Sequence, residues 1–322
     1  MAASPVQPQD FLIVDLRDLR GSDLDSLLAE QTAFWKQRFL WDFSASADVI
    51  RRFLDMRNLF GFALLREGTP IGYSYFVHED RKALVGDLFI TAAHRSEPAE
   101  RALLHNTIKS AVVFPNVRRV EGQLLGLSFN PHDEVVYGRG LSVFERNFMV
   151  LEDLRGFPIP RKPARGVSFQ TWSDRQLDGA AELVALSYRN HVDSLINDQY
   201  RTFAGARRFL FNTTQHPGCG VFCRPAALIA VDEAVARLAG ICLGSLVHPE
   251  IGHITQIAVG PGLQGRGIGF ELLRRSVAAF HAQRCRAVSL TVTAANHSAV
   301  NLYEHVGFRT FRQFYAFVWE AS

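Results

Sequence analysis

The chain lacks several features that would assign it to common protein classes. Its 322 residues include only 4 Cys, at spacings that fit neither a disulfide framework nor a four-ligand metal site. No apolar run reaches the ~18 residues of a membrane span, and residues 1–10 lack the basic start and apolar block of a signal peptide. The net charge of +3 is small for this length and argues against nucleic acid as a partner. We therefore expect a cytoplasmic protein with reduced cysteines, no metal, and neither a membrane nor nucleic acid as partner.

What the chain does have is apolar sequence in regular patterns. A hydrophobic content of 48% is ample for a packed core, and the length leaves room for two domains. Short strand-like runs alternate with helical patterns, which predicts an α/β fold. A stretch rich in Pro, Gly and basic residues predicts a linker at 154–166. The predicted parts are a loose tail at 1–10, a first domain at 11–153 and a second domain at 167–322.

The clearest motif lies in the second domain. Residues 254–259 form an Ile- and Val-rich run typical of a buried strand, a Gly-Pro-Gly turn ends it, and helical spacing begins at Ile268. Between them lies Gln-x-x-Gly-x-Gly at 264–269. Glycines let the backbone approach a ligand, and the first turn of a helix favours an anion. The pattern predicts a cradle for a pyrophosphate, to which Arg266 adds a charge-assisted contact.

Two other interpretations of the cradle compete. One is a tight strand-to-helix turn without a ligand. The other is a dinucleotide-binding turn, because glycines at 265, 267 and 269 partly match it. That fingerprint requires G-x-G-x-x-G and an acidic residue about 20 residues later. Here the spacing is G-x-G-x-G, and it is followed by a strand at 287–292 and a polar segment from Asn296 to Phe308.

With this continuation the chain resembles the GCN5-related N-acetyltransferases (GNAT). Their motif is Q/R-x-x-G-x-G/A, then a strand, an Asn, and a short helix ending in Tyr-x-x-x-Gly-Phe. The matching residues are Gln264, Gly267, Gly269, Asn296, Tyr303, Gly307 and Phe308. The resemblance implies acetyl-CoA as the cofactor and direct acetyl transfer to an amine in a ternary complex. The cofactor-binding residues it implies are Ile257, Ala258, Val259, Gln264, Gly265, Arg266, Gly267, Ile268, Gly269, Asn296 and Tyr303.

The first domain repeats part of this pattern. Asn130 to Tyr137 has the spacing of Asn296 to Tyr303, and in both places a glycine and an aromatic-rich strand follow. We therefore expect two tandem GNAT folds, each of which, as the resemblance implies, has a mixed central sheet with flanking helices. Residues 94–100, His-Arg-Ser-Glu-Pro-Ala-Glu, occupy the place of the cradle, where the lack of glycine and the two glutamates disfavour phosphate. The first copy is thus predicted to be degenerate, not to bind CoA, and to pack on the second. In length and in its degenerate first half, the layout resembles mycothiol synthase, another tandem member.

Acetyl transfer needs an acid for the leaving thiolate and a base for the amine. The resemblance implies Tyr303 as the acid. Many family members have a Glu at the start of the central strand; here His253 takes that position, and Glu250 is a second candidate that would act through water. A packed tyrosine and a strand-edge histidine are the structural alternatives. A backbone N–H near Ala258 or Val259 would stabilise the oxyanion. No metal is required, and His248, His253 and His297 do not have ligand spacing.

A polar segment at 189–200 is the predicted acceptor site. Its candidate residues for an ammonium-bearing substrate are His191, Asp193, Asp198 and Tyr200. The alternative is a solvated connection in which Asp198 caps the next helix. The predicted function is N-acetylation of a small-molecule or amino-acid-like amine. A protein or peptide acceptor, a longer acyl chain, and a non-catalytic acyl-CoA sensor or scaffold are the alternatives. A homodimer is compatible with the sequence.

Overall fold

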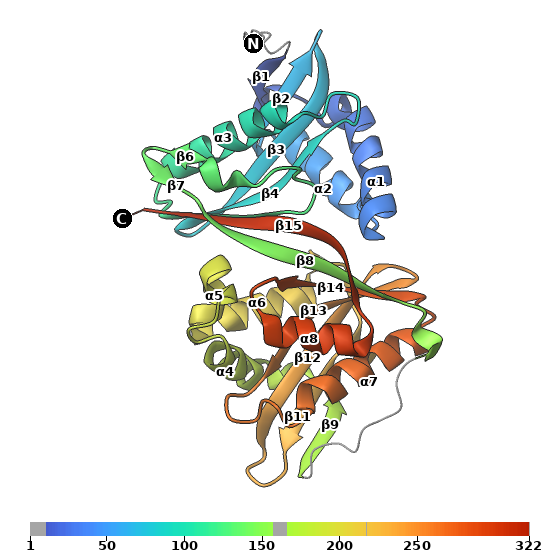
Figure 1. The fold of residues 1–322 in the computed structure, drawn as a ribbon. Coiled ribbons are helices and arrows are strands. Elements are labelled where there is room, and N and C mark those ends of the chain that lie inside the picture. Colours follow the sequence, from blue (N-terminus) through green and yellow to red (C-terminus); the bar gives the residue numbers. More distant parts are fainter. Residues whose placement is uncertain (1–10, 157–165, 217, 322) are drawn as a thin grey trace, which may run out of the picture. The chain divides into compact units, whose positions relative to one another are not determined.

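The computed structural model describes residues 11–156, 166–216 and 218–321, which form two compact units. The first unit contains the chain up to Val143 and the segment from Phe314 onward; the second is Phe144–Gln313. The predicted tail at 1–10 and residues 157–165 of the predicted linker lie outside the described residues. Figure 1 shows the helices and strands of each unit with their labels.

The first unit is a mixed sheet with helices on both faces. Its strand order is β1-β2-β3-β4-β5-β15, in which β4 and β5 are parallel and the other neighbours antiparallel. The strands are β1 (Leu12–Asp15), β2 (Phe60–Arg66), β3 (Thr69–Glu79), β4 (Lys82–Ile90), β5 (Arg119–Leu124) and the end of β15 (Arg309–Glu320). Helix α3 (Glu97–Val113) packs on one face, and α1 (Asp25–Phe39) and α2 (Ser44–Asp55) pack on the other.

The second unit has the same plan. Its strand order is β8-β14-β13-β12-β11-β9, with β10 paired to β12, and only β13 and β14 are parallel. The strands are β8 (Ser142–Glu152, from Phe144 in this unit), β9 (Val167–Thr171), β10 (Val221–Phe222), β11 (Leu228–Asp232), β12 (Arg237–His248), β13 (Ile251–Val259) and β14 (Ala287–Thr293). The helices are α4 (Leu177–Ser187), α5 (Asp193–Ile196), α6 (Phe203–Gln215), α7 (Ile268–Ala282) and α8 (His297–Val306).

Two apolar clusters cover the two faces of this second sheet. Side chains of α7 and α8 share one cluster with β8 and β14, while α4 and α6 share the other with β11 and β12. Glycine permits the close approach of α7: a Cβ added at Gly252 would lie 2.6 Å from the ring of Phe280. The predicted α/β class, with mixed sheets and flanking helices, is confirmed.

The two compact units do not coincide with the two predicted domains, because the last strand of each predicted domain belongs to the other unit. Strand β8 ends the predicted first domain, 11–153, yet its residues from Phe144 pair with β14 in the second unit. Strand β15 ends the predicted second domain, 167–322, yet its residues from Phe314 belong to the first unit, where they pair with β5. The predicted boundaries therefore describe repeats of sequence, and each unit contains the last strand of the other repeat.

The similarity between segments 130–137 and 296–303 does not extend to secondary structure. The second segment forms α8, whereas the first forms a 3₁₀ turn at Pro131–Asp133 followed by a hairpin of β6 (Val135–Val136) and β7 (Arg139–Gly140). Tyr137 and Gly138 have φ of 51° and 74°, values that suit a two-residue hairpin turn and interrupt a helix.

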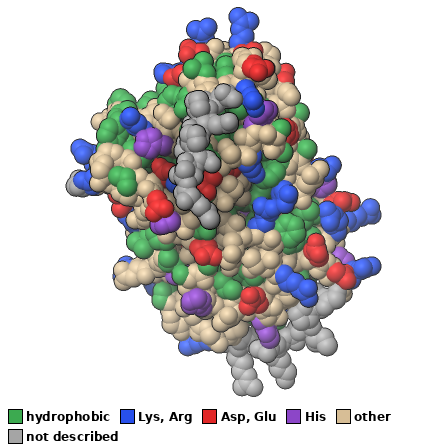
Figure 2. All heavy atoms as spheres, turned by 45° about the horizontal axis from the view of Figure 1, so that its top comes forward, with side chains coloured by type: hydrophobic (Ala, Val, Ile, Leu, Met, Phe, Trp, Pro, Cys, Tyr) green, Lys and Arg blue, Asp and Glu red, His purple; other side chains and the backbone are tan. Residues whose placement is uncertain are grey.

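The surface carries charges of both signs. On the face in Figure 2, basic and acidic side chains of the described residues are interspersed with uncharged ones. In the part of the chain that the structure describes, no helix combines the length and apolar character needed to cross a membrane.

Candidate acetyl-CoA and acceptor site

The loop between β13 and α7 forms an open backbone surface. Gly262, Gly265 and Gly267 have φ of 79°, 75° and 81°, the left-handed region in which other residues are strained. A Cβ built at any of the three would have no atom within 4 Å, so nothing of the described chain fills the space beside them. The predicted glycine-rich turn between strand and helix is therefore present, with open space beside it; its binding of a pyrophosphate stays a prediction.

The start of α7 adds polarity to this surface. Its first backbone hydrogen bond runs from Glu271 N–H to Gly267 O, so the N–H groups of Ile268 and Gly269 have no acceptor within the helix. Arg266 is exposed, and its guanidinium has no ion-pair partner among the described residues. Unpaired N–H groups, a helix dipole and a free cation together fit a phosphate-bearing ligand.

Strands β13 and β14 separate beside this loop. Their parallel pairing ends at Ile254 and Leu290, although both strands continue. An irregularity in the pairing with β12 leaves Thr255 without a Cα partner there, which is a β-bulge. From Thr255 onward, the edge of β13 that faced β14 is open.

The register identifies which backbone groups face the opening. Gly260 N–H donates to Ala239 O at 2.9 Å, and hydrogen-bonded pairs alternate along an antiparallel ladder. Ala258 therefore bonds to β12, whereas Ile257 and Val259 turn their N–H and C=O groups away from it. Consistently, the carbonyls of Ile257 and Val259 accept side-chain hydrogen bonds, from Tyr188 at 3.4 Å and from Ser187 at 3.1 Å. The sequence offered Ala258 or Val259 for the oxyanion, and the geometry favours Val259 and adds Ile257.

Two predicted cofactor residues also have roles within the chain. The Gln264 side chain donates to Val259 O at 3.4 Å, which places it beside the open edge. Asn296 caps α8, since its Oδ1 accepts from Ala299 N–H at 3.2 Å. This leaves the Asn296 amide NH₂ as a donor. Ile268 is buried under the first turn of α7, and a Cβ added at Gly269 would lie 3.4 Å from Val259 Cγ2 and 3.6 Å from Leu302 Cδ2.

Tyr303 lies on α8 in a desolvated position. Its side chain is buried, and its hydroxyl has no hydrogen-bond partner among the described residues. Burial raises the pKa of Tyr303, and the charge of Asp193 acts in the same direction while Arg146 opposes it. The hydroxyl is therefore protonated at neutral pH and able to donate.

The two predicted bases lie elsewhere. His253 is on the paired part of β13, buried, with Nδ1 2.9 Å from Ser289 Oγ; burial lowers the pKa of His253 to about 4. Glu250 is exposed in the turn before β13, with Arg286 Nε at 3.7 Å. The structure does not bring Glu250 to the open edge, which begins at the other side of the bulge.

The predicted acceptor segment places Asp193 at the sheet. Asp193 Oδ1 accepts from the Thr293 hydroxyl at the end of β14, and Oδ2 lies 3.6 Å from His191 Nδ1. Asp198 starts a 3₁₀ turn, Asp198–Arg201, but it caps no helix: Asn197 caps that turn and Thr202 caps α6. The capping alternative for Asp198 was therefore wrong.

Tyr200 takes part in a polar chain that ends at β13. Its ring lies 4.5 Å from that of Tyr188, centroid to centroid, and its hydroxyl donates to Gln256 Oε1 at 3.4 Å. Gln256 Nε2 donates in turn to the Tyr188 hydroxyl at 2.8 Å. The predicted Tyr200 is thus connected to the open edge of β13 through two residues that the sequence analysis did not select.

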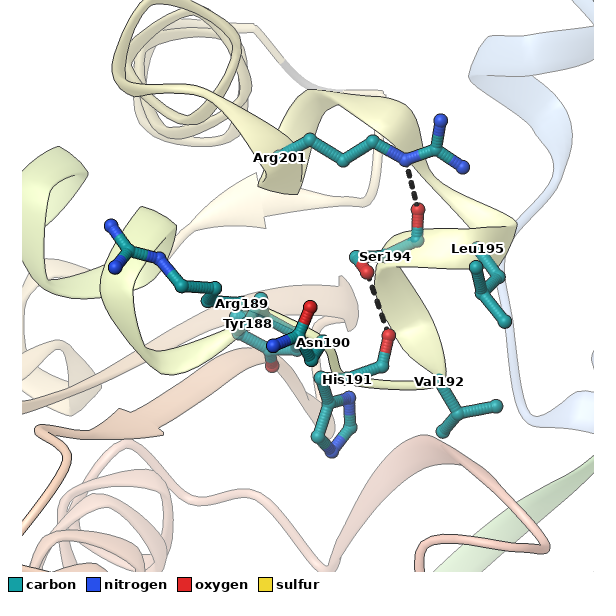
Figure 3. A pocket seen from close by; sticks show the side chains of 8 residues that line it. All are labelled: Tyr188, Arg189, Asn190, His191, Val192, Ser194, Leu195 and Arg201. Carbon is teal, nitrogen blue, oxygen red and sulfur yellow. Dashed lines mark hydrogen bonds between the residues drawn. The ribbon is translucent and has the colours of Figure 1, made fainter.

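Tyr188 of this hydrogen-bonded series also lines a cavity of about 560 Å³. Figure 3 shows the side chains that line it: Tyr188, Arg189, Asn190, His191, Val192, Ser194, Leu195 and Arg201. Two hydrogen bonds fix its wall, from Arg201 Nε to Ser194 O and from Ser194 Oγ to His191 O, both at 2.7 Å. The lining mixes cationic, polar and apolar side chains, which suits a small polar molecule.

Sequence reasoning missed Arg146. This buried residue lies on β8, which the sequence assigns to the first repeat, and pairs in register with Thr293. Its Nη1 lies 3.9 Å from Asp193 Oδ1. Arg146 reaches the acceptor segment because β8 belongs to the sheet of the second unit. The sequence around residue 146 does not predict this pairing.

In the first unit the corresponding loop is closed by its own side chains. Glu100, fully buried in α3, accepts from Ser128 N–H at 3.1 Å and lies 3.3 Å from Arg95 Nε. Residues 94–100 contain no glycine. A carboxylate held at this helix start occupies the kind of position that a phosphate needs in the second unit.

Part of the chain matches a family of known proteins. Residues 192–308 match the model of the acetyltransferase (GNAT) family. The putative [ribosomal protein bS18]-alanine N-acetyltransferase of Bacillus subtilis (strain 168) is 35% identical over 83 residues, covering 26% of this chain and 54% of that protein. The chain therefore spans about half the length of this curated relative.

Solved structures extend the likeness to the whole chain. A GCN5-related N-acetyltransferase from Sphaerobacter thermophilus has a TM-score of 0.67 and 18% identity, covering 98% of this chain and 97% of that one. A tandem GNAT protein from the clavulanic acid biosynthesis pathway has a TM-score of 0.56 and 17% identity, with 97% and 99% covered. At such identities the likeness concerns the fold. Residues 192–308 thus match the acetyltransferase (GNAT) family, and the whole chain shares the fold of the tandem GNAT protein.

Proposed function

We propose that the protein is an acetyl-CoA-dependent N-acetyltransferase whose acceptor is the primary amine of a small, amino-acid-like molecule. The observation that carries the proposal is the open glycine loop at the start of α7 beside the unpaired edge of β13. A backbone surface of this kind serves no purpose in packing, since a Cβ at its positive-φ glycines would contact nothing. It fits a ligand that combines phosphates with an extended arm.

Different groups of the chain would bind different parts of acetyl-CoA. The N–H groups of Gly265 to Gly269 and the Arg266 guanidinium would hold the pyrophosphate. The open groups of Ile257 and Val259 would pair with the amides of the pantetheine arm, and the Asn296 amide is a further donor. Bound acetyl-CoA would supply the acetyl thioester, whose carbonyl carbon forms a bond to the amine nitrogen while its bond to sulfur breaks.

Proton transfer completes the balance. A base first removes protons from the acceptor, whose ammonium loses one before the attack and one as the amide forms; an acid then gives one proton to the departing sulfur. The Tyr303 hydroxyl is protonated at neutral pH and unpartnered within the described chain, so it suits the second role. A pKa of about 4 makes His253 a weak base at neutral pH, and Glu250 is remote, so we favour a water beside the polar chain of Tyr188 and Gln256 as the first proton acceptor.

A peptide acceptor is the second candidate. The curated relative in Bacillus subtilis bears the name of an N-acetyltransferase that acts on an alanine of ribosomal protein bS18. Screening free amines, amino acids and short peptides for acetyl-CoA-dependent thiol release separates the two candidates.

The proposal is tested first by calorimetric titration of acetyl-CoA into the full chain. We expect one site of micromolar affinity that is lost in Gly267→Glu, because a side chain at φ of 81° is strained and its carboxylate repels phosphate. Gly68→Glu is the matched control: Gly68 has φ of 78° and equally open surroundings, in the hairpin between β2 and β3. Two sites would show that the first unit also binds the cofactor. Absence of binding to the wild type would rule out the enzyme and favour a scaffold.

A further inference from the structure

Arg146 occupies an unusual position on the sheet of the second unit. It lies on β8 opposite Thr293 of β14, so the two side chains project from the same face. Thr291, two residues earlier on β14, also projects from this face. Asp193 of α5 covers it, as shown by the hydrogen bond from Thr293. A guanidinium and a carboxylate therefore meet at the end of the open edge between β13 and β14.

The Arg146 guanidinium is buried and poorly satisfied. The residue is 9% exposed, yet its nearest acceptor is Thr291 Oγ1, 3.4 Å from Nη2. Among the described residues, its Nε has no hydrogen-bond partner. A guanidinium offers five N–H donors in a planar fork that matches a carboxylate. Burying that fork with one long hydrogen bond is unfavourable unless another acceptor binds to it.

Asp193 does not supply that acceptor. Its Oδ1 is 3.9 Å from Arg146 Nη1, beyond hydrogen-bond distance, and is already bonded to the Thr293 hydroxyl. Its Oδ2 faces His191. The two opposite charges are thus held side by side, each with capacity for a further partner.

The pair also lies near the hydroxyl groups of the proposed reaction site. The charges of Asp193 and Arg146 both act on Tyr303 and on Tyr200, with opposite sign. An acceptor held between them would therefore be close to the residue that protonates the leaving thiolate.

We infer that the acceptor carries a carboxylate next to its amine, and that Arg146 binds the carboxylate while Asp193 receives the ammonium. In an α-amino acid both groups are attached to one carbon, so its adjacent charges match the adjacent, opposite charges of the two side chains. A peptide N-terminus lacks that carboxylate. This inference rests on the proposed N-acetyltransferase function and assigns a specificity-determining role to a residue of the first sequence repeat.

The test uses matched acceptors: a panel of free α-amino acids and the corresponding α-amino-acid amides, with acetylation followed by thiol release. We expect the wild type to prefer the acids by about 100-fold in kcat/KM, the range for a buried charge-assisted contact. Arg146→Gln should reduce this preference to a ratio near one. Arg146→Lys, which keeps the charge without the fork, should restore part of it. Arg224→Gln, which removes an exposed arginine paired with Asp174, should leave the wild-type preference.

Several outcomes would overturn the inference. Equal loss for acids and amides in Arg146→Gln would assign Arg146 a structural role, and thermal unfolding of the variants would show the loss of fold. A wild type that acetylates amides or peptides as well as acids would contradict the carboxylate subsite and leave the proposed activity standing. Binding of acetyl-CoA without acetylation of any panel member would refute both the small-amine activity and the subsite.

Discussion

At the scale of single residues, the acid role proposed for Tyr303 depends on the surroundings of its side chain. Its burial raises the pKa, so the phenol is neutral over the whole physiological range. A neutral phenol is useless as a base and suited to donation. The absence of a hydrogen-bond partner within the described chain leaves the donated proton available for a group that arrives with the substrate.

Replacing this hydroxyl should affect turnover more than binding. Tyr303→Phe keeps the packed ring in its apolar cluster, so we expect acetyl-CoA affinity within a few-fold of the wild type and a kcat about 10²- to 10⁴-fold lower, the range for loss of an acid. Steady-state kinetics and calorimetry measure the two effects. Tyr137→Phe, at an exposed tyrosine of the first unit, serves as control. An unchanged kcat in Tyr303→Phe would remove the acid role.

At the scale of elements, β13 combines a paired half and an open half. Before the bulge at Thr255, His253 lies in register with Ser245 and Ser289 of the neighbouring strands and is buried. A neutral imidazole fits there because it is partnered by Ser289 and pays no cost for a buried charge. Because of His253, we expect the free energy of unfolding to depend on pH.

Whether the protein gains or loses stability at low pH follows from the direction in which the pKa of His253 is shifted. The folded-state pKa of His253 is lowered to about 4, while an unfolded histidine titrates near 6.5. Below pH ~6.5 His253 is protonated in the unfolded chain but stays neutral in the folded chain, so the free energy of unfolding falls as the pH drops toward 4. Between pH 7 and pH 5 we expect His253 to account for a loss of about 1–2 kcal/mol.

Denaturant unfolding at the two pH values measures this loss. The drop should be smaller in His253→Gln than in the wild type, whereas His281→Gln, at an exposed histidine, should match the wild type. Equal drops in all three proteins would mean that His253 is protonated in the folded state at pH 5.

Element by element, much of this was accessible from the sequence. The cradle was predictable because glycine at positive φ, a strand end and a helix start have local signatures. Segment 130–137 was not, since its likeness to 296–303 lies in spacing, while Pro131 and the turn at Tyr137 decide its structure. Arg146 was not predictable either, because strand pairing across 147 residues of sequence, from Arg146 to Thr293, depends on tertiary register.

At the scale of the whole molecule, the exchange of last strands decides which fragment of the chain contains a complete second unit. The second sequence repeat, 167–322, lacks β8 and so leaves β14 with an open edge and no Arg146. It also carries Phe314, Phe317 and Trp319, whose burial belongs to the first unit. By contrast, 144–313 is continuous and contains every strand of the second sheet.

We therefore expect fragment 144–313 to be better folded than fragment 167–322. Circular dichroism, hydrogen exchange and acetyl-CoA titration of the two fragments measure the difference, with the full chain as reference. Fragment 167–322 should aggregate because of its unpaired strand edge and exposed aromatic side chains. A cooperative unfolding transition in 167–322 equal to that of 144–313 would contradict this expectation.

The place of β15 after the whole second unit has a consequence for biosynthesis. Residues 11–143 of the first unit are synthesised before the second unit, yet their sheet takes its sixth strand from residues 314–320. Until residues 314–320 have been synthesised, β5 has no partner on that side, and Phe317 and Trp319 are missing from the first core. The first unit therefore stays incomplete while the second is synthesised, so a chaperone that shields β5 would act during that interval.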